Sequence, residues 1–385
     1  MHFIDWIIIT SYLVFLISLG VYLGRKQKET KDYFLGGKSL SWWSIGLSTM
    51  ATQLGAVSFI SAPAFVGLRE NGGLIWLGYE FALPFAMIIL IWKVIPLFHN
   101  TGVVSIYEFL ELRFDVKTRK FISLIFLLSR GFATGITIYA TAIVVAVVMK
   151  LDIYYTIFII GAVSIAYDFF GGIKAVVYSD VIQMVLIFCG IFICGAFGIY
   201  YAGGVDSIVS ALSPSRLTAV QFNHFGFEKG KDFGFLPLLF GGFFMYISYY
   251  GFDQSQVQRE LSARSLTDSR KSLLVNAFLR YPLVLLYCIL GLIIGYVALQ
   301  NPEFLQKVQS YGRADYMIPV FITDYLPTGL TGLIVVAILA ASMSSLDSAL
   351  NSLSASTMED FIKPKYQNLS DKELLLYSKI ITLLW

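Results

Sequence analysis

The chain has 385 residues, of which 57% are hydrophobic and only 14% are charged, and its formal net charge is +3. A typical soluble domain carries about 25% charged residues. This composition therefore excludes a soluble globular protein and indicates one that lies largely within a lipid bilayer. The small net charge gives no indication of a nucleic-acid partner.

Apolar segments recur along the whole chain, and most reach the length of about 20 residues that a helix needs to cross a bilayer. The predicted spans are residues 3–24, 41–67, 74–98, 121–149, 153–171, 175–201, 234–252, 273–299 and 328–357. A tenth apolar segment begins near Leu374 and runs to Trp385. We therefore predict an all-α, multi-pass integral membrane protein whose last span is incomplete in this chain.

The orientation in the membrane follows from the positive charges between the spans. Lys and Arg are concentrated in alternate loops, mainly in residues 25–38, 113–120, 259–271 and 363–372. Such loops lie on the cytoplasmic side. The N-terminus is then outside, and its segment should remain as a helix, because no basic stretch precedes it as in a cleavable signal.

No catalytic or metal-binding motif stands out between or within the spans. The three cysteines, Cys189, Cys194 and Cys288, lie inside apolar segments without metal-site spacing. We interpret them as packing residues, since unpaired cysteine is commonly buried. The histidines are scattered rather than clustered, which argues against a membrane enzyme.

Two spans carry glycine and proline in a way that predicts broken helices. Residues 41–67 contain Gly46, Gly55, Pro63 and Gly67, and residues 234–252 contain Pro237, Gly241, Gly242 and Gly251. Each of these spans opens a group of five. Interrupted helices at matching places in two halves are typical of an inverted-repeat transporter, whose binding site lies where they unwind. We predict an extra helix in residues 1–30, a first repeat in 41–201 and a second in 234–385.

Residues 340–352, AASMSSLDSALNS, place polar side chains in the span 328–357. At about 100° per residue, Ser344, Ser348 and Asn351 fall on one face. Hydroxyl and carbonyl oxygens suit a hard cation, although membrane serines also bond to their own helix or to a neighbouring one. Asp347 favours a functional role, because a carboxylate inside the membrane is costly and is usually retained for a function.

Other ionisable residues lie within the spans. Asp168 and Asp180 lie near the predicted cytoplasmic boundary, which by position alone suggests structural charges. Glu80 and Arg130 lie deeper, where they face either a solute or each other.

Four segments resemble the sodium:solute symporter family, also called the sodium/glucose cotransporter family. They are residues 33–40 (YFLGGKSL), 171–183 (GGIKAVVYSDVIQ), 249–259 (YYGFDQSQVQR) and 341–348 (ASMSSLDS), and the likeness extends from about residue 5 to the end. The resemblance implies a LeuT-type five-plus-five inverted repeat behind one extra helix, with broken first and sixth core helices. The second repeat is then truncated here, because family members continue further.

The resemblance also implies sodium as the coupling ion, bound between the first broken helix and the eighth core helix. The expected ligands are the carbonyls of Ala51, Leu54 and Ala341 and the hydroxyls of Ser344 and Ser345. Some members hold a second sodium nearer the cytoplasm. Its expected ligands here are Asp180, Ser345, Asp347 and Ser348. Asp347 stands where such members have a hydroxyl, so the number of sodium ions stays open.

The residues expected to contact the solute by this resemblance are Gln53, Ser58, Glu80, Arg130, Tyr246, Tyr249 and Arg280. Sugar-transporting members match at Glu80 and Tyr249 but differ at Ser58, Tyr246 and Arg280. Arg130 occupies the region where sialic-acid members bind a carboxylate, and a guanidinium does so bidentately. An anionic solute of the monocarboxylate, sialic acid or vitamin type is favoured, with a sugar left open.

The sequence thus predicts a sodium-driven symporter in the cytoplasmic membrane, importing a small organic solute by alternating access. The alternative within this fold is a proton-coupled or exchanging carrier that uses Asp347 or Asp180 as the proton site. A membrane enzyme and a non-transporting sensor are the other classes, and no motif in the chain supports either.

Overall fold

The computed structural model describes residues 1–228, 233–366 and 368–385, and the regular elements within these ranges are helices. The elements up to residue 201 are α1 (Phe3–Gly24), α2 (Thr30–Leu35), η1 (Gly36–Lys38), α3 (Trp42–Gln53), α4 (Ala56–Gly67), η2 (Leu74–Ala82), α5 (Leu83–Ile89), η3 (Leu90–Val94), α6 (Ile95–Thr101), α7 (Ile106–Arg113), α8 (Val116–Met149) and α9 (Ile153–Tyr201). The later ones are α10 (Val205–Ala211), α11 (Pro214–Leu217), α12 (Phe235–Phe252), α13 (Gln254–Leu261), α14 (Leu266–Gln300), α15 (Pro302–Ser310), η4 (Ala314–Tyr316), α16 (Met317–Tyr325), α17 (Leu330–Thr357), η5 (Met358–Ile362), α18 (Lys363–Lys365) and α19 (Asp371–Leu384).

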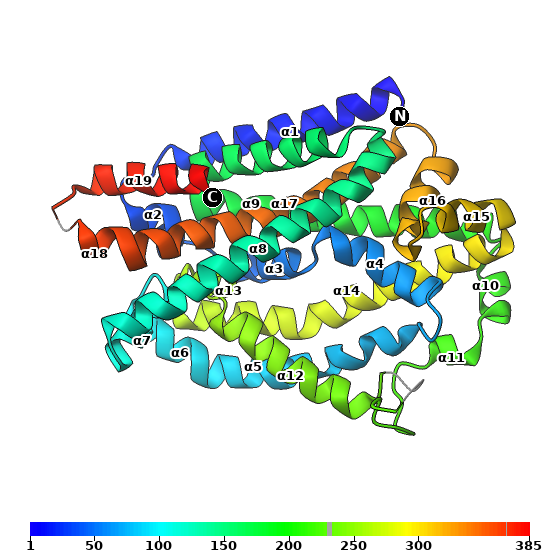
Figure 1. Cartoon of the computed structure of the whole chain (residues 1–385), viewed down its shortest axis with the longest axis horizontal. Coiled ribbons are helices and arrows are strands. Elements are labelled where there is room, and N and C mark those ends of the chain that lie inside the picture. Colours follow the sequence, from blue (N-terminus) through cyan, green and yellow to red (C-terminus); the bar gives the residue numbers. More distant parts are fainter. Residues whose placement is uncertain (229–232, 367) are drawn as a thin grey trace.

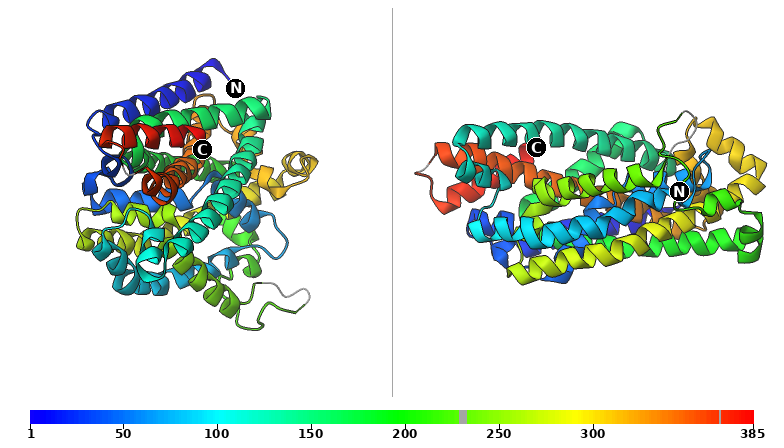
Figure 2. Two further views of the ribbon diagram at one scale, coloured as in Figure 1. Left: turned by 60° about the vertical axis from the view of Figure 1, so that its left-hand side comes forward. Right: turned by 90° about the horizontal axis from the view of Figure 1, so that it is seen from below.

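The long helices run roughly along one common axis (Figure 1), and the same elongated bundle is seen from two further directions in Figure 2. The short helices gather at its two ends, with α2, α7 and α18 at one and α10, α15 and α16 at the other. Seven helices of the described ranges are long and apolar enough to cross a membrane, or eight if the bent pair α3 and α4 is one span. The protein is therefore a multi-pass membrane protein, as its composition predicts.

The helix α17 forms the centre of the bundle. It packs against α9, α8, α1 and α3, and nearly all of its residues are buried. Much of its surface consists of alanine and serine, and small side chains let neighbouring membrane helices approach closely. Its polar face is thus enclosed by protein rather than by lipid.

The helix α1 is fixed to this centre at its first turn. Asp5 completes a capping box with His2, and its carboxylate also accepts hydrogen bonds from the backbone N–H groups of Gly329 (2.7 Å) and Gly332 (2.9 Å) at the start of α17. A carboxylate at a helix N-terminus satisfies unpaired N–H groups and the helix dipole. Near its other end, α1 approaches α9 so closely at Gly24 that a Cβ would overlap the carbonyl oxygen of Phe170.

The helix α9 covers two predicted spans, 153–171 and 175–201. It is interrupted at Gly172, where φ is 56° and ψ is −154°. This conformation is open to glycine but strained for other residues, and the ring of Tyr33 fills the space where a side chain would lie. The two halves of α9 therefore act as separate spans, as the sequence predicts.

The first predicted broken helix is confirmed. The helices α3 and α4 meet at a bend of 60°, and Leu54 at the junction is not helical, with φ −94° and ψ 59°. Gly55 follows Leu54 and is the N-cap residue of α4. The backbone groups around Leu54 are thus released from the regular helical pattern in the middle of the bundle.

The sequence predicts the second break within residues 234–252, where the glycines lie. The structure places it after them. The helix α12 is continuous through Gly241 and Gly242, and the chain leaves the helix only at Asp253, with φ −91° and ψ 122°. Asp253 then caps α13 by accepting a hydrogen bond from the N–H of Ser255. Gly242 instead allows close packing, since a Cβ there would lie 2.6 Å from the carbonyl oxygen of Tyr79.

Candidate functional site

A cavity of about 420 Å³ lies beside the first break, between α3, α4, α8, α12 and α17. Its walls include five residues predicted to bind solute or sodium: Gln53, Ser58, Arg130, Tyr249 and Ser345. Thr134, Thr137 and Ser342 add further hydroxyl groups. The cavity thus combines a largely apolar lining with several polar groups, and it lies against the unwound backbone, where a transporter of this kind binds its solute.

Arg130 is the cation of this cavity. Its guanidinium donates to Asp253 (3.3 Å) and to the hydroxyl of Ser255 (2.9 Å) at the second break. Its buried Nε has no hydrogen-bond partner in the described part of the chain. Arg130 therefore lines the cavity while it links α8 to the break in the sixth core helix.

Glu80, Arg280 and Tyr246 form a closed cluster instead of lining the cavity. Arg280 binds Glu80 bidentately, through Nε and one terminal nitrogen, at 3.0 Å each, and the hydroxyl of Tyr246 donates to Glu80 at 2.7 Å. All three side chains are buried. Three of the seven predicted solute residues thus bind one another, and Glu80 and Arg130 do not pair, contrary to one of the two alternatives weighed for them.

Gln53 connects this cluster to the cavity. Its side-chain oxygen accepts a hydrogen bond from Tyr250, whose ring packs against Tyr246. Gln53 is therefore oriented by the sixth core helix although it belongs to the first broken helix.

The residues of the predicted first sodium site lie partly together. The hydroxyl of Ser345 donates to the carbonyl of Thr52 at 2.8 Å. A Cβ built on Gly55 would lie 3.0 Å from that hydroxyl and 4.0 Å from the carbonyl oxygen of Ala341. Ala341 and Ser345 thus face the break that contains Leu54. The carbonyl of Ala51 accepts from the N–H of Leu54 at 3.1 Å.

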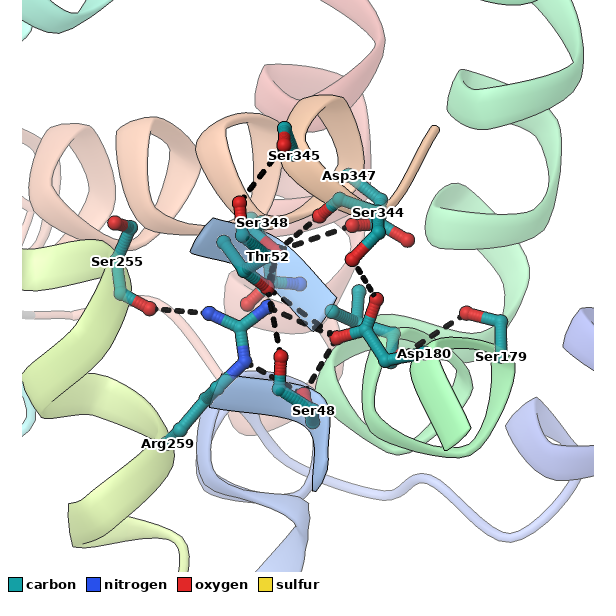
Figure 3. A network of polar contacts seen from close by, with 12 residues as sticks. Ser48, Thr52, Ser179, Asp180, Ser255, Arg259, Ser344, Ser345, Asp347 and Ser348 are labelled. Atoms are coloured by element: carbon teal, nitrogen blue, oxygen red, sulfur yellow. Dashed lines mark hydrogen bonds and ion pairs between the residues drawn. The ribbon is translucent and has the colours of Figure 1, made fainter. Parts of the chain in front are cut away.

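Ser344 belongs to a second polar network, on the side of α17 nearer α9 (Figure 3). Its hydroxyl donates to Asp180 at 2.5 Å, and Ser48 donates to the same carboxylate at 2.5 Å. Ser348 donates to Asp347 at 3.1 Å, and the hydroxyl of Tyr167 is bonded to Asp347 as well. Of the predicted second sodium ligands, Asp180, Asp347 and Ser348 are therefore brought together, whereas Ser345 faces the first break.

Arg259 is the residue of this network that sequence reasoning missed. It ends the quoted segment 249–259 and is completely buried. Its guanidinium donates to Asp180 (3.1 Å), to Ser48 (2.7 Å) and to Ser348. A signal was available, since an arginine beside a predicted broken helix needs a buried acid as partner. The carboxylate of Asp180 is fully enclosed by protein and is paired with Arg259.

Asp168 is fully buried as well, so its carboxylate does not reach the surface of the bundle. One carboxylate oxygen accepts from the amide of Asn351 at 2.9 Å, and the other has no hydrogen-bond partner within the described ranges. The described residues contain no group of three or more His, Cys, Asp and Glu placed to hold a metal ion.

Comparison with known proteins agrees with this geometry. A sequence description of the sodium:solute symporter family matches residues 33–385. The chain belongs to this family. The relatives described below are named as sodium-coupled transporters, so the chain belongs to a family of transport proteins.

Three curated relatives are named for different solutes. The sodium/sialic acid symporter NanT of Aliivibrio fischeri is 32% identical, with 98% of this chain and 74% of the relative covered. The sodium/glucose cotransporter of Vibrio parahaemolyticus is 30% identical, with 94% and 69% covered. The human sodium-coupled monocarboxylate transporter 1 is 30% identical, with 96% and 60% covered. This chain thus spans well under the full length of each of them.

Solved structures support the fold. A substrate-bound, outward-open Na⁺-coupled sialic acid symporter superimposes with a TM-score of 0.90 at 27% identity, covering 100% of this chain and 80% of that one. The nucleobase-cation-symport-1 transporter MHP1 matches with a TM-score of 0.59 at 14% identity, over 94% of this chain and 74% of that chain, which supports the fold alone. The chain therefore has the LeuT-type fold that the family resemblance predicts.

Proposed function

We propose that this protein is a sodium-driven symporter that imports a small organic anion by alternating access. The observation that carries the proposal is the cavity beside the first break, which has Arg130 on one wall and Ser345 on another. An arginine offers a planar fork for a carboxylate. The sodium and solute sites then adjoin at the same unwound segment, which lets each ligand affect the binding of the other.

The proposed sodium ligands are the carbonyls of Ala51, Leu54 and Ala341 and the hydroxyls of Ser344 and Ser345. The present hydrogen bonds of the two serines are compatible with this role. A serine hydroxyl has one proton to donate and keeps two lone pairs. Ser345 can therefore donate to Thr52, and Ser344 to Asp180, while their oxygens still coordinate an ion.

An anion fits the cavity better than a sugar does. By the family resemblance, residues at the positions of Glu80, Tyr246 and Arg280 contact the sugar in the sugar branch, but here these side chains bind one another. Breaking such a buried pair to bind a sugar would leave an uncompensated charge, which is costly. Gln53, Ser58, Arg130 and Tyr249 remain as the proposed solute residues.

The driving force follows from the charge that is moved. A membrane potential of about 100 mV contributes about 2.3 kcal/mol for each sodium that enters. Sodium and solute must tighten each other's binding by the same factor, because coupling is reciprocal. Sodium that ties α17 to the first broken helix would favour the state that binds solute.

The proposal includes a location and an arrangement in the membrane. The protein lies in the cytoplasmic membrane, with lipid around the bundle, its N-terminus outside, and the end bearing α2, α7 and α18 in the cytoplasm, where the basic loops lie. Residues 41–201 and 234–385 form the two inverted repeats behind the helix within 1–30. Neither an enzymatic activity nor a nucleic-acid partner is part of this proposal.

A proton-coupled carrier is the second candidate, because Asp347 lies fully buried and is bonded to the hydroxyl of Tyr167. A carboxylate enclosed in this way can bind a proton, instead of a sodium ion, during transport. Sodium coupling is the stronger proposal, since the serines at the first break provide oxygen ligands of the kind that sodium needs.

Uptake into proteoliposomes tests both candidates. Radiolabelled monocarboxylates, sialic acid, an anionic vitamin, glucose and an amino acid are offered with an inward sodium gradient and without sodium. The expected result is sodium-dependent uptake of at least one anion and none of glucose. Uptake that follows a pH gradient in sodium-free buffer would replace sodium coupling by proton coupling, and uptake of glucose alone would refute the assignment of an anion.

A further inference from the structure

We propose that the guanidinium of Arg259 is a tethered competitor for the second sodium: it holds the cation position between Asp180 and Ser348 while that ion is absent, and it must leave when the ion binds. The inference rests on the proposed function, since it concerns the coupling ion of the same transporter. It assigns a role in coupling to a residue that contacts neither the cavity nor the first sodium site.

The geometry of the guanidinium supports this role. Its Nε donates to Ser48 at 2.7 Å and one terminal nitrogen donates to the backbone carbonyl of Ser255 at 2.5 Å. The other terminal nitrogen donates to both Asp180 (3.1 Å) and Ser348. This last nitrogen therefore lies between two of the proposed second sodium ligands, where the ion itself would lie (Figure 3).

The charges around the site show why a cation is needed there. Asp180, Asp347 and Asp168 are each completely buried. Arg259 is the one cation that pairs with any of them in the described ranges. Uncompensated carboxylates in a membrane interior are strongly unfavourable, so the site is stable without sodium only because the protein supplies its own cation.

Sodium and the guanidinium cannot occupy the position together. Both bind through the Asp180 carboxylate and the Ser348 hydroxyl, and two positive charges at contact distance repel strongly in a buried site. Asp347 adds a second carboxylate next to Ser348, at 3.1 Å from its hydroxyl. This additional negative charge favours exchange, since it attracts the incoming ion while Arg259 is displaced.

The exchange would act on the cytoplasmic half of the sixth core helix. Arg259 belongs to α13 and links it to α3 through Ser48, to α9 through Asp180 and to α17 through Ser348. Its neighbour Gln258 remains bonded to Asn351 of α17 at 2.7 Å. Displacing the guanidinium therefore removes its hydrogen bonds to α3, α9 and α17, while the bond of Gln258 still holds α13 to α17. Filling the second site then prepares the cytoplasmic side to open, and the return of Arg259 after sodium leaves closes it again.

Binding of ²²Na to the purified protein in nanodiscs tests this competition without any solute. The informative variant is Ser48→Ala, because Ser48 holds the guanidinium and is not a proposed sodium ligand. Loss of the Ser48 hydroxyl removes one charge-assisted hydrogen bond that holds the guanidinium of Arg259. We therefore expect the sodium dissociation constant of the weaker of two sites to fall by about tenfold. Arg259→Gln should lower that constant further. The matched control is Ser44→Ala, one turn away on α3, where the buried hydroxyl bonds to Ser41 instead.

The double variant separates competition from a direct effect of Ser48 on Asp180, to which it also donates. In the Arg259→Gln background, Ser48→Ala should leave sodium affinity unchanged, because no competitor remains to be weakened. Weaker or unchanged sodium binding in Ser48→Ala alone, or an equal effect in both backgrounds, overturns the proposal. If Arg259→Gln does not yield folded protein, sodium binding in Ser48→Ala that is no tighter than in Ser44→Ala still overturns the proposal.

Failure of this inference would leave the proposed function intact. Sodium-dependent uptake that is lost in Ser345→Ala, together with unchanged sodium binding in Ser48→Ala, would support the symporter and reject the competition. Absence of sodium-dependent uptake in the unmodified protein would instead reject the proposed function itself.

Discussion

The hydroxyl of Ser345 on α17 donates a hydrogen bond of 2.8 Å to the carbonyl of Thr52 on α3, just before the chain leaves the helix at Leu54. This contact joins the central helix to the first broken helix at the mouth of the cavity. It lies where the proposed sodium would bind, so the ion and the hydroxyl act on the same pair of helices.

Ser345→Ala tests the first sodium site. Removal of one oxygen ligand should raise the sodium concentration for half-maximal uptake by roughly tenfold, with little change in expression, because only one half-buried hydroxyl is lost from a helix of small residues. Solute uptake at varied external sodium concentrations measures this half-maximal concentration. Ser352→Ala is the control, since that buried hydroxyl bonds only within its own helix, to Ala349. Sodium activation that stays as in the unmodified protein would reject the site.

Arg130→Lys tests recognition of an anion. Lysine keeps the charge but loses the planar fork, so the KM for the anionic solute should rise by roughly tenfold, and Arg130→Gln should raise it further. Initial uptake rates at saturating sodium provide the measurement. Thr137→Val, on the same cavity wall, controls for altered cavity shape. An unchanged KM in both arginine variants would show that Arg130 only links α8 to the second break.

The pair of Glu80 and Arg280 should be structural. Glu80→Ala would leave Arg280 buried without its bidentate partner, which costs roughly 3–5 kcal/mol of stability. The double variant Glu80→Leu with Arg280→Met should recover most of this loss, since it removes both charges together. Thermal unfolding of the purified protein in detergent measures both. A double variant that remains stable but loses uptake of every solute would instead place the pair in the solute site.

Much of the architecture could be predicted from the sequence because it depends on local properties. The spans follow from the length of apolar runs, and the bend between α3 and α4 lies inside the glycine-rich span 41–67, at Leu54. The position of the second break could not be read in this way. It depends on Asp253, a capping residue at the end of an apolar run, whereas Gly242 serves a close contact with another segment.

The sequence alone could predict which kinds of ligand group the site contains, but not how its residues pair. The serine face of α17 indicates a cation site, but the partner of each charge depends on helices that are distant in sequence. Glu80 pairs with Arg280, 200 positions later, and Asp180 pairs with Arg259 of α13. Position along a span likewise does not reveal that the surrounding helices bury both Asp168 and Asp180.

Asp347→Ser replaces the unusual carboxylate by a hydroxyl, as in relatives of this family according to the resemblance. We expect uptake to remain sodium-driven, with sodium affinity weakened by roughly tenfold or more, since a charged partner is lost from the second site. The measurement is uptake against sodium concentration, with a parallel assay under a pH gradient in sodium-free buffer. Proton-driven uptake that is present in the unmodified protein and lost in Asp347→Ser would contradict a sodium role for this residue.

A pH effect on stability should come from Glu108, on α7 outside the membrane spans. Its carboxylate binds Arg119 at 3.3 Å and accepts from the N–H of Val104 at 3.3 Å. Burial, reinforced by the neighbouring charge of Glu359, raises the pKa of Glu108 from 4.5 to about 7. The folded protein thus holds this proton more tightly than the unfolded chain does. The resulting stabilisation is complete below pH 4.5 and is lost as the pH rises to about 7.

Glu108→Gln should therefore reduce the loss of thermal stability between about pH 5 and about pH 8, because glutamine stays neutral at both values. Unfolding temperatures of the purified protein in detergent across this range measure the effect. Glu111→Gln is the matched control, since Glu111 binds the same arginine at 2.7 Å from a more exposed position. If Glu108→Gln loses stability as steeply as the unmodified protein, the buried carboxylate of Glu108 does not set the pH dependence.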